Sequence, residues 1–370
     1  MKKIAIVIGT RPEGIKLAPL INCIKNEFNY VFTPLVISTG QHKEILDDVF
    51  NFFNITPDIT LTIDRSNPTL SSLQSQLVQS LESIFIKESP DIAVVQGDTH
   101  STLSGAMAAF YQKIPVAYVE SGLRSGNLYE PFPEEANRKM ITQLTKWHFT
   151  PTKKAADALK IEGIQDDVYE VGNTVIDALM QAKSSLVKSN NEKHAYIHQH
   201  QQNRKMILIT VHRRENWGNG LQNIMKAVNQ LLSRYEDLDI VWLTHPNPTI
   251  KQQVQDALGS TANIYIYPPA NYVELVQLMN LSTIILTDSG GIQEEAPSLN
   301  KPVLVAREVT ERMEGVDAGC AKLVGVDTNT IIQNVSELLE SEERYTKMTD
   351  VKNPYGDGTT SQQILSILAG

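Results

Sequence analysis

The chain has 370 residues, of which 41% are hydrophobic and 20% are charged, and its formal net charge is −9. This length is more than one ordinary compact core holds, so we expect two domains in a soluble globular protein. The acidic balance argues against a nucleic-acid-binding protein, which would show a basic face, and no apolar run reaches the roughly 20 residues of a membrane helix.

The N-terminal apolar run reads as a buried first strand. It is too short for a signal peptide, and GTRPE follows where a small-residue cleavage site would stand. Apolar runs then alternate with amphipathic segments of helical length, which is typical of parallel α/β architecture. The predicted strands are 4–8, 31–38, 91–96, 115–119, 147–150, 168–171, 206–211, 239–244, 264–267, 283–287, 302–305 and 321–324. The predicted helices include 13–26, 70–88, 99–112, 218–234 and 328–340.

Polar residues crowd positions 183–205, which we interpret as lying near a domain junction. Each doubly wound sheet binds ligands beyond the carboxyl ends of its strands, so two facing domains would share one cleft. The same stretch holds His194, His198 and His200, which could bind a metal ion or be solvated. Because no carboxylate or cysteine accompanies them, we expect solvated side chains and no metal site.

The two cysteines, Cys23 and Cys320, lie far apart in apolar surroundings. This usage indicates buried thiols in a reducing compartment rather than a redox pair or a nucleophile. We therefore expect a cytoplasmic protein.

The turn after the first predicted strand reads GTRPEGIK at 9–16. A Walker phosphate loop would need Lys at 15 and Ser or Thr at 16, so an ATPase or kinase is excluded. No Gly-x-Gly-x-x-Gly follows this strand either, which argues against a nicotinamide cofactor. What remains is a tight turn carrying Arg11 and Lys16, which could bind a diphosphate or be surface charges at a helix start.

Carboxylates follow two further strands of the first half. Asp98 follows the strand at 91–96 and Glu120 follows the strand at 115–119, so both should line the same edge of one sheet. Asp98 could equally cap the helix at 99–112. Glu120 ends a buried run and needs a partner, because burying an unpaired carboxylate is costly.

The segment PFPEEANR at 131–138 adds two more carboxylates, Glu134 and Glu135, with Arg138 one turn later. These residues could belong to the same site. They could also be the ordinary start of a helix, with acids in its first turn and a salt bridge at helical spacing.

In the second half, polar residues follow two predicted strands. HRREN begins at His212 and includes Arg213 and Glu215, and HPNP begins at His245. A third run, DSGGIQEEAP at 288–297, follows the strand at 283–287 and opens a predicted helix. Backbone amides at a helix start attract anions, and glycines let a phosphate approach closely. The carboxylates behind them suit sugar hydroxyls, so the run predicts a nucleotide-sugar site, or else an acid-rich first helical turn.

Taken together, GTRPEGIKLAPL, GDTHST, VESGLRS, PFPEEANR, HRREN, HPNP and DSGGIQEEAPSLNKPVLV with a later TER resemble the non-hydrolysing UDP-N-acetylglucosamine 2-epimerases. The resemblance runs in order from Gly9 to about Gly358. It implies a GT-B-type α/β fold, with two Rossmann-like doubly wound domains and an interdomain cleft. The domains would be 1–172, with a C-terminal helix at about 359–370 packing back on it, and 173–358.

The resemblance also implies a reaction: reversible C2 epimerisation of UDP-GlcNAc to UDP-ManNAc, by anti elimination of UDP to 2-acetamidoglucal and re-addition. Members of the family use no metal or other cofactor, act as homodimers and supply surface polysaccharide precursors. The implied catalytic residues are Asp98, Glu120, Glu134 and His212. The implied UDP- and substrate-binding residues are Arg11, Lys16, Arg138, Ser289, Gly290, Gly291, Glu295 and Arg312.

Some members bind a second UDP-GlcNAc as an activator, through residues that match Gln41, Arg213, Glu215 and His245. The chain departs from the family pattern at His100–Ser101, where Thr-Thr is usual, and at Ser121 and Met313, where Ala and Pro are usual. These departures bear on which sugar is used rather than on the reaction.

Alternatives remain at this stage: an epimerase of a related UDP-2-acetamido sugar, a GT-B glycosyltransferase, a hydrolytic epimerase or a nucleotide-sugar sensor. The density of carboxylates at 98, 120 and 134 favours elimination over glycosyl transfer. Which carboxylate removes the C2 proton is left open.

Overall fold

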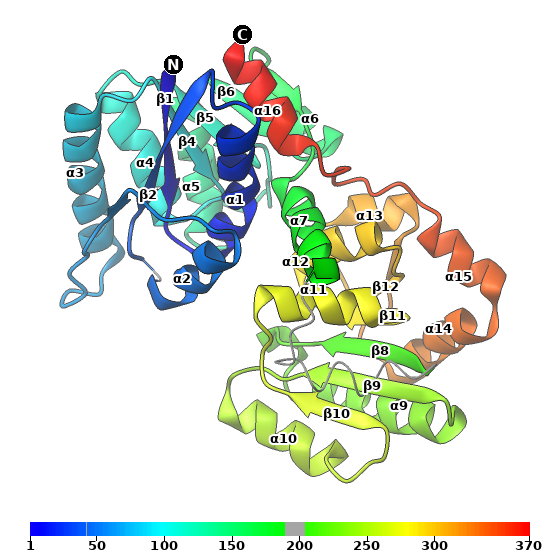
Figure 1. Cartoon of the computed structure of the whole chain (residues 1–370). Helices are drawn as coiled ribbons and strands as arrows, with labels where there is room; N and C mark the ends of the chain where they lie inside the picture. The colour runs from blue at the N-terminus through cyan, green and yellow to red at the C-terminus, as the bar shows by residue number, and fades with distance from the viewer. Residues whose placement is uncertain (42, 189–203) are drawn as a thin grey trace. The chain divides into compact units, whose positions relative to one another are not determined.

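The computed structural model describes residues 1–41, 43–188 and 204–370. The chain forms two compact units (Figure 1). Unit 1 comprises Met1–Met180 together with Tyr355–Gly370, and unit 2 comprises Gln181–Pro354. The predicted histidines at 194, 198 and 200 lie outside the described residues.

Unit 1 is built on a seven-stranded parallel sheet in the order β3-β2-β1-β4-β5-β6-β7. Its strands are β1 (Lys2–Ile8), β2 (Phe32–Ser38), β3 (Ile59–Thr60), β4 (Ile92–Gln96), β5 (Val116–Val119), β6 (Trp147–Thr150) and β7 (Val168–Glu170). Its helices are α1 (Arg11–Asn26), α2 (Lys43–Phe52), α3 (Leu70–Glu88), α4 (His100–Tyr111), α5 (Glu134–Leu144), α6 (Lys153–Ile161) and α16 (Thr360–Ala369). The C-terminal helix α16 packs against α1, as the red and dark blue helices of Figure 1 show. Helix α7 (Thr174–Lys188) leads from unit 1 into unit 2.

Unit 2 is built on a six-stranded parallel sheet in the order β10-β9-β8-β11-β12-β13. Its strands are β8 (Lys205–Thr210), β9 (Leu238–Leu243), β10 (Ile264–Tyr267), β11 (Ile284–Thr287), β12 (Val303–Val305) and β13 (Ala321–Leu323). Its α-helices are α9 (Asn219–Arg234), α10 (Pro248–Leu258), α11 (Tyr272–Leu281), α12 (Gly290–Glu295), α13 (Met313–Ala318), α14 (Thr328–Glu340) and α15 (Glu342–Thr349). Two short 3-10 segments, Arg214–Asn216 and Ala296–Leu299, complete it.

The strands read as continuous apolar runs because helices cover both faces of each sheet. In unit 1 the core includes Val7 of β1 and Val95 of β4, and in unit 2 it includes Ile209 of β8, all at most 1% exposed. Cys23 and Cys320 are buried and free, as predicted. Burial raises the pKa of Cys23 to about 12 and that of Cys320 to about 11, so both remain thiols at neutral pH.

Both sheets have the strand order of a Rossmann fold, so the predicted α/β class is confirmed. The order reverses between β1 and β4 in unit 1, and between β8 and β11 in unit 2. Doubly wound sheets bind ligands beyond the carboxyl ends of their strands at this reversal. Each unit thus has one place where the topology favours a site.

Among the described residues, no helix has both the length and the apolar composition needed to cross a membrane.

Two glycines with the same backbone conformation allow a test of packing at the turn after β5. Gly122 has φ 89° and an added Cβ would lie 2.3 Å from the carbonyl oxygen of Ala155. Gly163 has φ 85°, and among the described residues an added Cβ would meet no further heavy atom within 4 Å. Alanine at Gly163 should lower the free energy of unfolding by about 1–2 kcal/mol, the cost of left-handed backbone. Alanine at Gly122 should cost about 1–3 kcal/mol more, because the carbonyl must move.

Chemical denaturation of the two variants and of the parent protein would measure both losses. Equal losses at the two positions would contradict the packing argument.

Candidate active site

The clearest sign of a functional site in unit 1 is the backbone of Glu120, directly after β5. Its φ is 64°, a region that a residue with a side chain enters at a cost of about 1–3 kcal/mol. The side chain is nevertheless buried. Strain of this kind persists where the surrounding structure holds a side chain in a required position.

The carboxylate of Glu120 has the partner that its burial requires. Lys16 Nζ donates to both of its oxygens, at 2.5 and 2.7 Å. Asn173 Nδ2 donates at 3.1 Å, and the Gln96 amide donates to Oε2. Lys16 comes from α1 and Gln96 ends β4, so three elements meet at this carboxylate. A carboxylate held by an ammonium group and two amides is stabilised in its ionised form.

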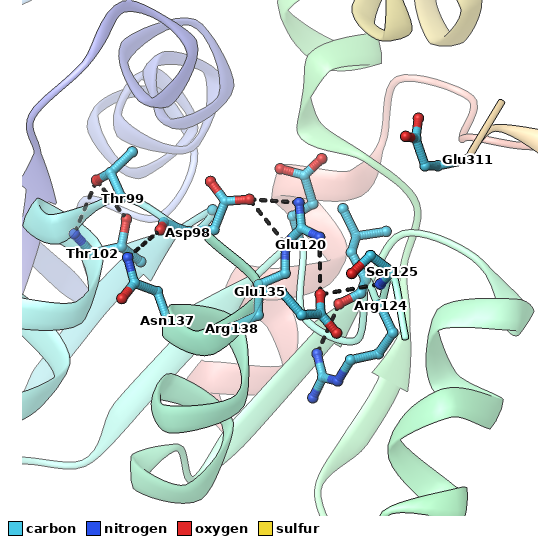
Figure 2. A network of polar contacts seen from close by, with 12 residues as sticks. Asp98, Thr99, Thr102, Glu120, Arg124, Ser125, Glu135, Asn137, Arg138 and Glu311 are labelled. Carbon is cyan, nitrogen blue, oxygen red and sulfur yellow. Dashed lines mark hydrogen bonds and ion pairs between the residues drawn. The ribbon is translucent and has the colours of Figure 1, made fainter. Parts of the chain in front are cut away.

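Asp98 follows β4 and does not cap the next helix. Helix α4 begins at His100, and its cap is Thr99, whose hydroxyl accepts a hydrogen bond from the Thr102 backbone. The capping alternative is therefore wrong. Instead, Asp98 Oδ2 accepts hydrogen bonds from Arg138, at 2.9 Å from Nε and 2.6 Å from Nη2. Figure 2 shows this pair and the Asn137 side chain donating to the backbone oxygen of Asp98 at 2.8 Å.

The two carboxylates that open α5 have different surroundings. Glu135 is fully buried, and its Oε2 accepts from Arg138 at 3.2 Å and from the Ser125 backbone at 3.1 Å (Figure 2). The salt bridge predicted at helical spacing is thus made by Glu135. The Oε2 atom of Glu134 is buried without a hydrogen-bond partner among the described residues.

Glu13 belongs to the same sheet edge, and the sequence analysis missed its role. Its carboxylate accepts from the backbone amides of Gly9 at 2.5 Å and Thr10 at 3.0 Å. It also accepts from the hydroxyls of Thr99 and Thr102. Burial raises the pKa of Glu13, and these hydrogen bonds oppose the shift. Thr10 followed by Glu three residues later is a helix-start signature that could have been read from the sequence.

These contacts place several predicted site residues at the strand reversal of unit 1. Glu13 joins the turn after β1 to the turn after β4, and Lys16 joins α1 to Glu120. Arg11, the first residue of α1, follows the same turn. The cluster brings together Asp98, Glu120, Lys16 and Arg138, all of which the sequence analysis had proposed.

At the strand reversal of unit 2, the central residue is Asp288, fully buried after β11. Its carboxylate accepts from the backbone amides of His212 at 3.0 Å and Arg213 at 2.8 Å, and from Asn216 Nδ2 at 2.8 Å. The turn after β8 is thereby fixed to the end of β11. Asp288 and Asn216 organise this turn, and the predicted list of site residues had omitted both.

His212 lies half in solvent, with Nδ1 3.2 Å from Asp288 Oδ1. Burial of the ring lowers its pKa, an effect that Asp288 opposes and that Arg213 and His245 reinforce. The ring is therefore neutral at pH 7. Because a carboxylate can only accept, Nδ1 carries the proton and Nε2 is an acceptor until an anion nearby favours the charged form.

The glycine turn that follows Asp288 lies against a cation. A Cβ added at Gly290 would lie 3.1 Å from Arg312 Cζ, so a larger residue there would press against this guanidinium. Arg312 is held by Glu294, whose Oε1 is 2.9 Å from Nε. Ser289 and Gly291 flank this position, so the turn combines backbone amides with a positive charge. Such a combination suits a phosphate group.

Glu295 is buried in α12, and its Oε1 accepts a hydrogen bond from the Tyr272 hydroxyl at 2.8 Å. It thus lies behind the glycine turn, where the sequence analysis had proposed a ribose-binding acid.

The four residues named for a possible second site form contacts inside their own units. Gln41 accepts from the Ser101 hydroxyl at 2.7 Å in unit 1. In unit 2, Arg213 donates to the Asp288 backbone oxygen at 2.9 Å, and Glu215 pairs with Arg307 at 2.7 Å. The His245 ring packs edge-on against Trp217, with 5.5 Å between ring centroids. Their predicted role as an activator site remains a prediction.

Metal-ligand geometry is not found in the part of the chain that the structure describes. No group of three or more His, Cys, Asp or Glu side chains there could hold a metal ion. The carboxylates of unit 1 are instead matched by Lys16 and Arg138, which suits acid–base chemistry on a bound molecule.

Comparison with known proteins identifies the family. A family model described as UDP-N-acetylglucosamine 2-epimerase matches residues 25–369. The UDP-N-acetylglucosamine 2-epimerase of Neisseria meningitidis is 45% identical over 372 residues, which cover 99% of each chain. The enzyme of the same name from Escherichia coli K12 is 42% identical over 371 residues, covering 99% of this chain and 98% of that one.

Solved structures agree with this assignment. The structure of UDP-GlcNAc 2-epimerase from N. meningitidis bound to UDP-GlcNAc has a TM-score of 0.86 at 44% identity and covers 99% of both chains. A Staphylococcus aureus protein solved with UDP has a TM-score of 0.88 at 43% identity, covering 100% of this chain and 96% of that one. A glycosyltransferase from Rickettsia africae shares the fold, with a TM-score of 0.64 at 15% identity. The two parallel sheets with Rossmann strand order, the matched family model and the relatives that align over the full length lead to one conclusion: this chain belongs to the UDP-N-acetylglucosamine 2-epimerase family.

Proposed function

We propose that this enzyme interconverts UDP-GlcNAc and UDP-ManNAc by eliminating UDP to give 2-acetamidoglucal and adding it back. The main support is the cluster at the strand reversal of unit 1, where Asp98 and Glu120 are each paired with a cation. A glycosyltransferase would not need so many placed carboxylates. The N. meningitidis relative solved with UDP-GlcNAc supports the choice of substrate.

The reaction needs help at two carbons of the sugar. The C2 proton is not acidic, because no ketone is adjacent to it. Departure of UDP from C1 gives that carbon oxocarbenium character, which acidifies the C2–H bond and is stabilised by a nearby carboxylate. Removing the proton then gives the glucal, and returning a proton to the opposite face inverts C2.

Glu120 is suited to the electrostatic part of this task. Its charge is fixed by Lys16 and two amides, and its backbone is held in a strained conformation. Such a carboxylate stabilises positive charge at C1 without needing to move.

Asp98 is suited to proton removal. Arg138 contacts only one of its oxygens, Oδ2, while Oδ1 has no hydrogen bond among the described residues. The side chain is 26% exposed, so a ligand can reach it. Glu134, the third proposed carboxylate, lies one residue from Glu135 at the start of α5 and is the proposed acid.

Unit 2 is proposed to bind UDP. The backbone at Ser289, Gly290 and Gly291, together with Arg312, would hold the diphosphate, and Glu295 the ribose. His212 would meet the leaving diphosphate, whose negative charge favours the imidazolium form. In unit 1, Arg11, Lys16 and Arg138 would bind phosphate or order the carboxylates.

We further propose a homodimer in the cytoplasm that supplies surface polysaccharide precursors, with no metal or other cofactor. Support comes from the family pattern in the sequence and from the two buried, free thiols, which suit a reducing compartment.

Deuterium transfer from solvent tests the reaction itself. UDP-GlcNAc incubated with the enzyme in D₂O should give UDP-ManNAc carrying deuterium at C2, because the proton removed exchanges with solvent before another is returned. Proton NMR would follow both the product and the loss of the C2 signal. Conversion with the original hydrogen retained would contradict proton exchange at C2, and release of free ManNAc would place the enzyme in the hydrolytic class.

Asp98→Asn tests the role of the proposed base. Asparagine keeps the size of the side chain but cannot accept a proton, so kcat should fall by about 10²–10⁴-fold, the range expected for loss of an acid–base group. UDP binding, measured by calorimetry, should be almost unchanged. Asp157→Asn is the control, because Asp157 is exposed on α6 and should leave kcat intact. An active Asp98→Asn enzyme would remove this residue from the mechanism.

Asp288→Asn tests the construction of the UDP site. The new side-chain NH2 group could not accept hydrogen bonds from the backbone N–H groups of His212 and Arg213. The turn that carries these two residues should therefore shift. UDP binding should weaken about tenfold, corresponding to one lost buried hydrogen bond to a charged group. Asp239→Asn is the matched control, because Asp239 is equally buried in unit 2 but pairs with Arg204 at the opposite edge of the sheet. Equal affinity in the two variants would argue against Asp288 as the organising residue.

A further inference from the structure

A buried tyrosine outside the proposed catalytic set lies two residues before Glu120. Tyr118 belongs to β5 and is 1% exposed. Its side chain is part of the core cluster of unit 1 that also includes Val95 and Ile141. The hydroxyl donates a hydrogen bond to the backbone oxygen of Gly97 at 2.8 Å. The core thus holds the ring, and the ring holds its hydroxyl against a turn that follows β4.

This turn carries Asp98. Gly97 has φ 82°, a conformation that glycine adopts without strain. The next carbonyl oxygen, that of Asp98, accepts a hydrogen bond from Asn137 Nδ2 at 2.8 Å. Two successive carbonyl oxygens of the turn are therefore each held by a side chain, one from β5 and one from α5. A backbone held at both points limits the positions that the Asp98 side chain can take.

The Tyr118 hydroxyl is a permanent donor. Burial raises the pKa of Tyr118, and the negative charge of Asp98 acts in the same direction. The group is therefore protonated at neutral pH. Because a carbonyl oxygen can only accept, the proton lies between Tyr118 and Gly97. A carbonyl oxygen that loses a buried donor must move or find another partner, since a buried polar group without one is costly.

The same stretch of chain places the second proposed carboxylate. Glu120 follows β5 immediately, and the backbone oxygen of Val119 accepts from the Gly97 amide at 3.4 Å. Three successive residues, 118 to 120, thus join the turn of Asp98 to the strained backbone of Glu120. The separation of the two carboxylates depends on this connection.

The proposed reaction makes this separation important. Asp98 would act at C2 and Glu120 at C1, which are adjacent atoms of one sugar ring. Reacting groups must be held within a narrow range of distances, and a misplacement of about 1 Å can slow a reaction about 10²-fold.

We propose that Tyr118 is a positioning residue, whose hydroxyl fixes the turn of Asp98 and so sets the place of the proposed base relative to Glu120. This inference rests on the proposed epimerisation. In the elimination step, Asp98 takes the C2 proton and the electron pair of the C2–H bond forms the C1–C2 double bond. The bond from C1 to the UDP oxygen breaks, and its electrons leave with the diphosphate. Tyr118 takes no part in these bond changes and acts only through the place that it gives to Asp98.

Tyr118→Phe removes one oxygen and keeps the ring that the core needs. We expect kcat to fall at least about tenfold, because the turn of Asp98 loses one of its two side-chain donors. The KM should change by less than about a factor of two, because the proposed UDP contacts lie in unit 2. Tyr169→Phe is the matched control: Tyr169 lies on β7 of the same sheet, and its hydroxyl donates to Asp167 at an exposed place. Unchanged kcat in Tyr118→Phe would overturn the proposal, whatever the effect on folding stability.

An isotope effect shows which step the substitution slows. With UDP-GlcNAc that carries deuterium at C2, the isotope effect on kcat in Tyr118→Phe should equal or exceed that of the parent protein, because proton removal is the step that becomes slower. A smaller isotope effect in the variant would overturn the proposal, since a different step would then have been slowed.

A spectroscopic test does not depend on turnover. Arg138 Nε donates to Asp98 Oδ2 at 2.9 Å, so its NMR signal reports the position of Asp98. In protein labelled with ¹⁵N-arginine, this signal is identified by its absence in the Arg138→Lys spectrum. Tyr118→Phe should shift the signal and Tyr169→Phe should not, whereas an unshifted signal in Tyr118→Phe would refute the positioning role. If the parent protein converts no UDP-GlcNAc, the proposed reaction fails by itself, and the NMR result still decides whether Tyr118 positions Asp98.

Discussion

A buried carboxylate must be matched by donors or it destabilises the fold, and this constraint shapes the clusters in both units. In unit 1, Glu120 is matched by Lys16 of α1, Gln96 of β4 and Asn173, the residue before α7. In unit 2, Asp288 is matched by backbone amides after β8 and by Asn216. In each case the carboxylate ties separate turns together at the reversal of strand order. The geometry of each cluster therefore follows from charge pairing as much as from the path of the backbone.

The sequence predicted the sheets well because both are parallel and covered on both faces. Continuous apolar runs then mark the strands, and the structure has every strand that was predicted. The additional strand, β3, consists of Ile59 and Thr60 alone, and two residues carry no pattern that distinguishes a strand from a loop. Register across a sheet could not be predicted, because it depends on helices packing from both faces.

The sequence predicted which residues belong to the site of unit 1, but not which of them form ion pairs with one another. Position after a strand identified Asp98 and Glu120, since the carboxyl ends of parallel strands share one edge. The partners lie 40 and 104 residues away in the chain, so no local spacing reveals them. Local reasoning also offered one wrong alternative, a helix cap at Asp98, where Thr99 is the cap instead. Glu13 was overlooked although Thr10 with Glu three residues later is a readable helix-start signature. Asp288 was overlooked because a carboxylate that holds a distant backbone turn leaves no sign beyond a single acidic residue.

The pairing pattern carries more information about chemistry than the number of carboxylates does. Three acids in one unit, considered without their neighbours, are interchangeable candidates for acid, base and electrostatic stabiliser. Their surroundings make them distinct: a lysine with two amides holds Glu120, one arginine contacts one oxygen of Asp98, and Glu134 Oε2 is buried with no hydrogen-bond partner among the described residues. A group that must keep its charge throughout the reaction needs a fixed opposite charge, whereas a group that must give up a proton needs a neighbour that tolerates both forms. The proposed elimination and re-addition on the opposite face would require both kinds of group.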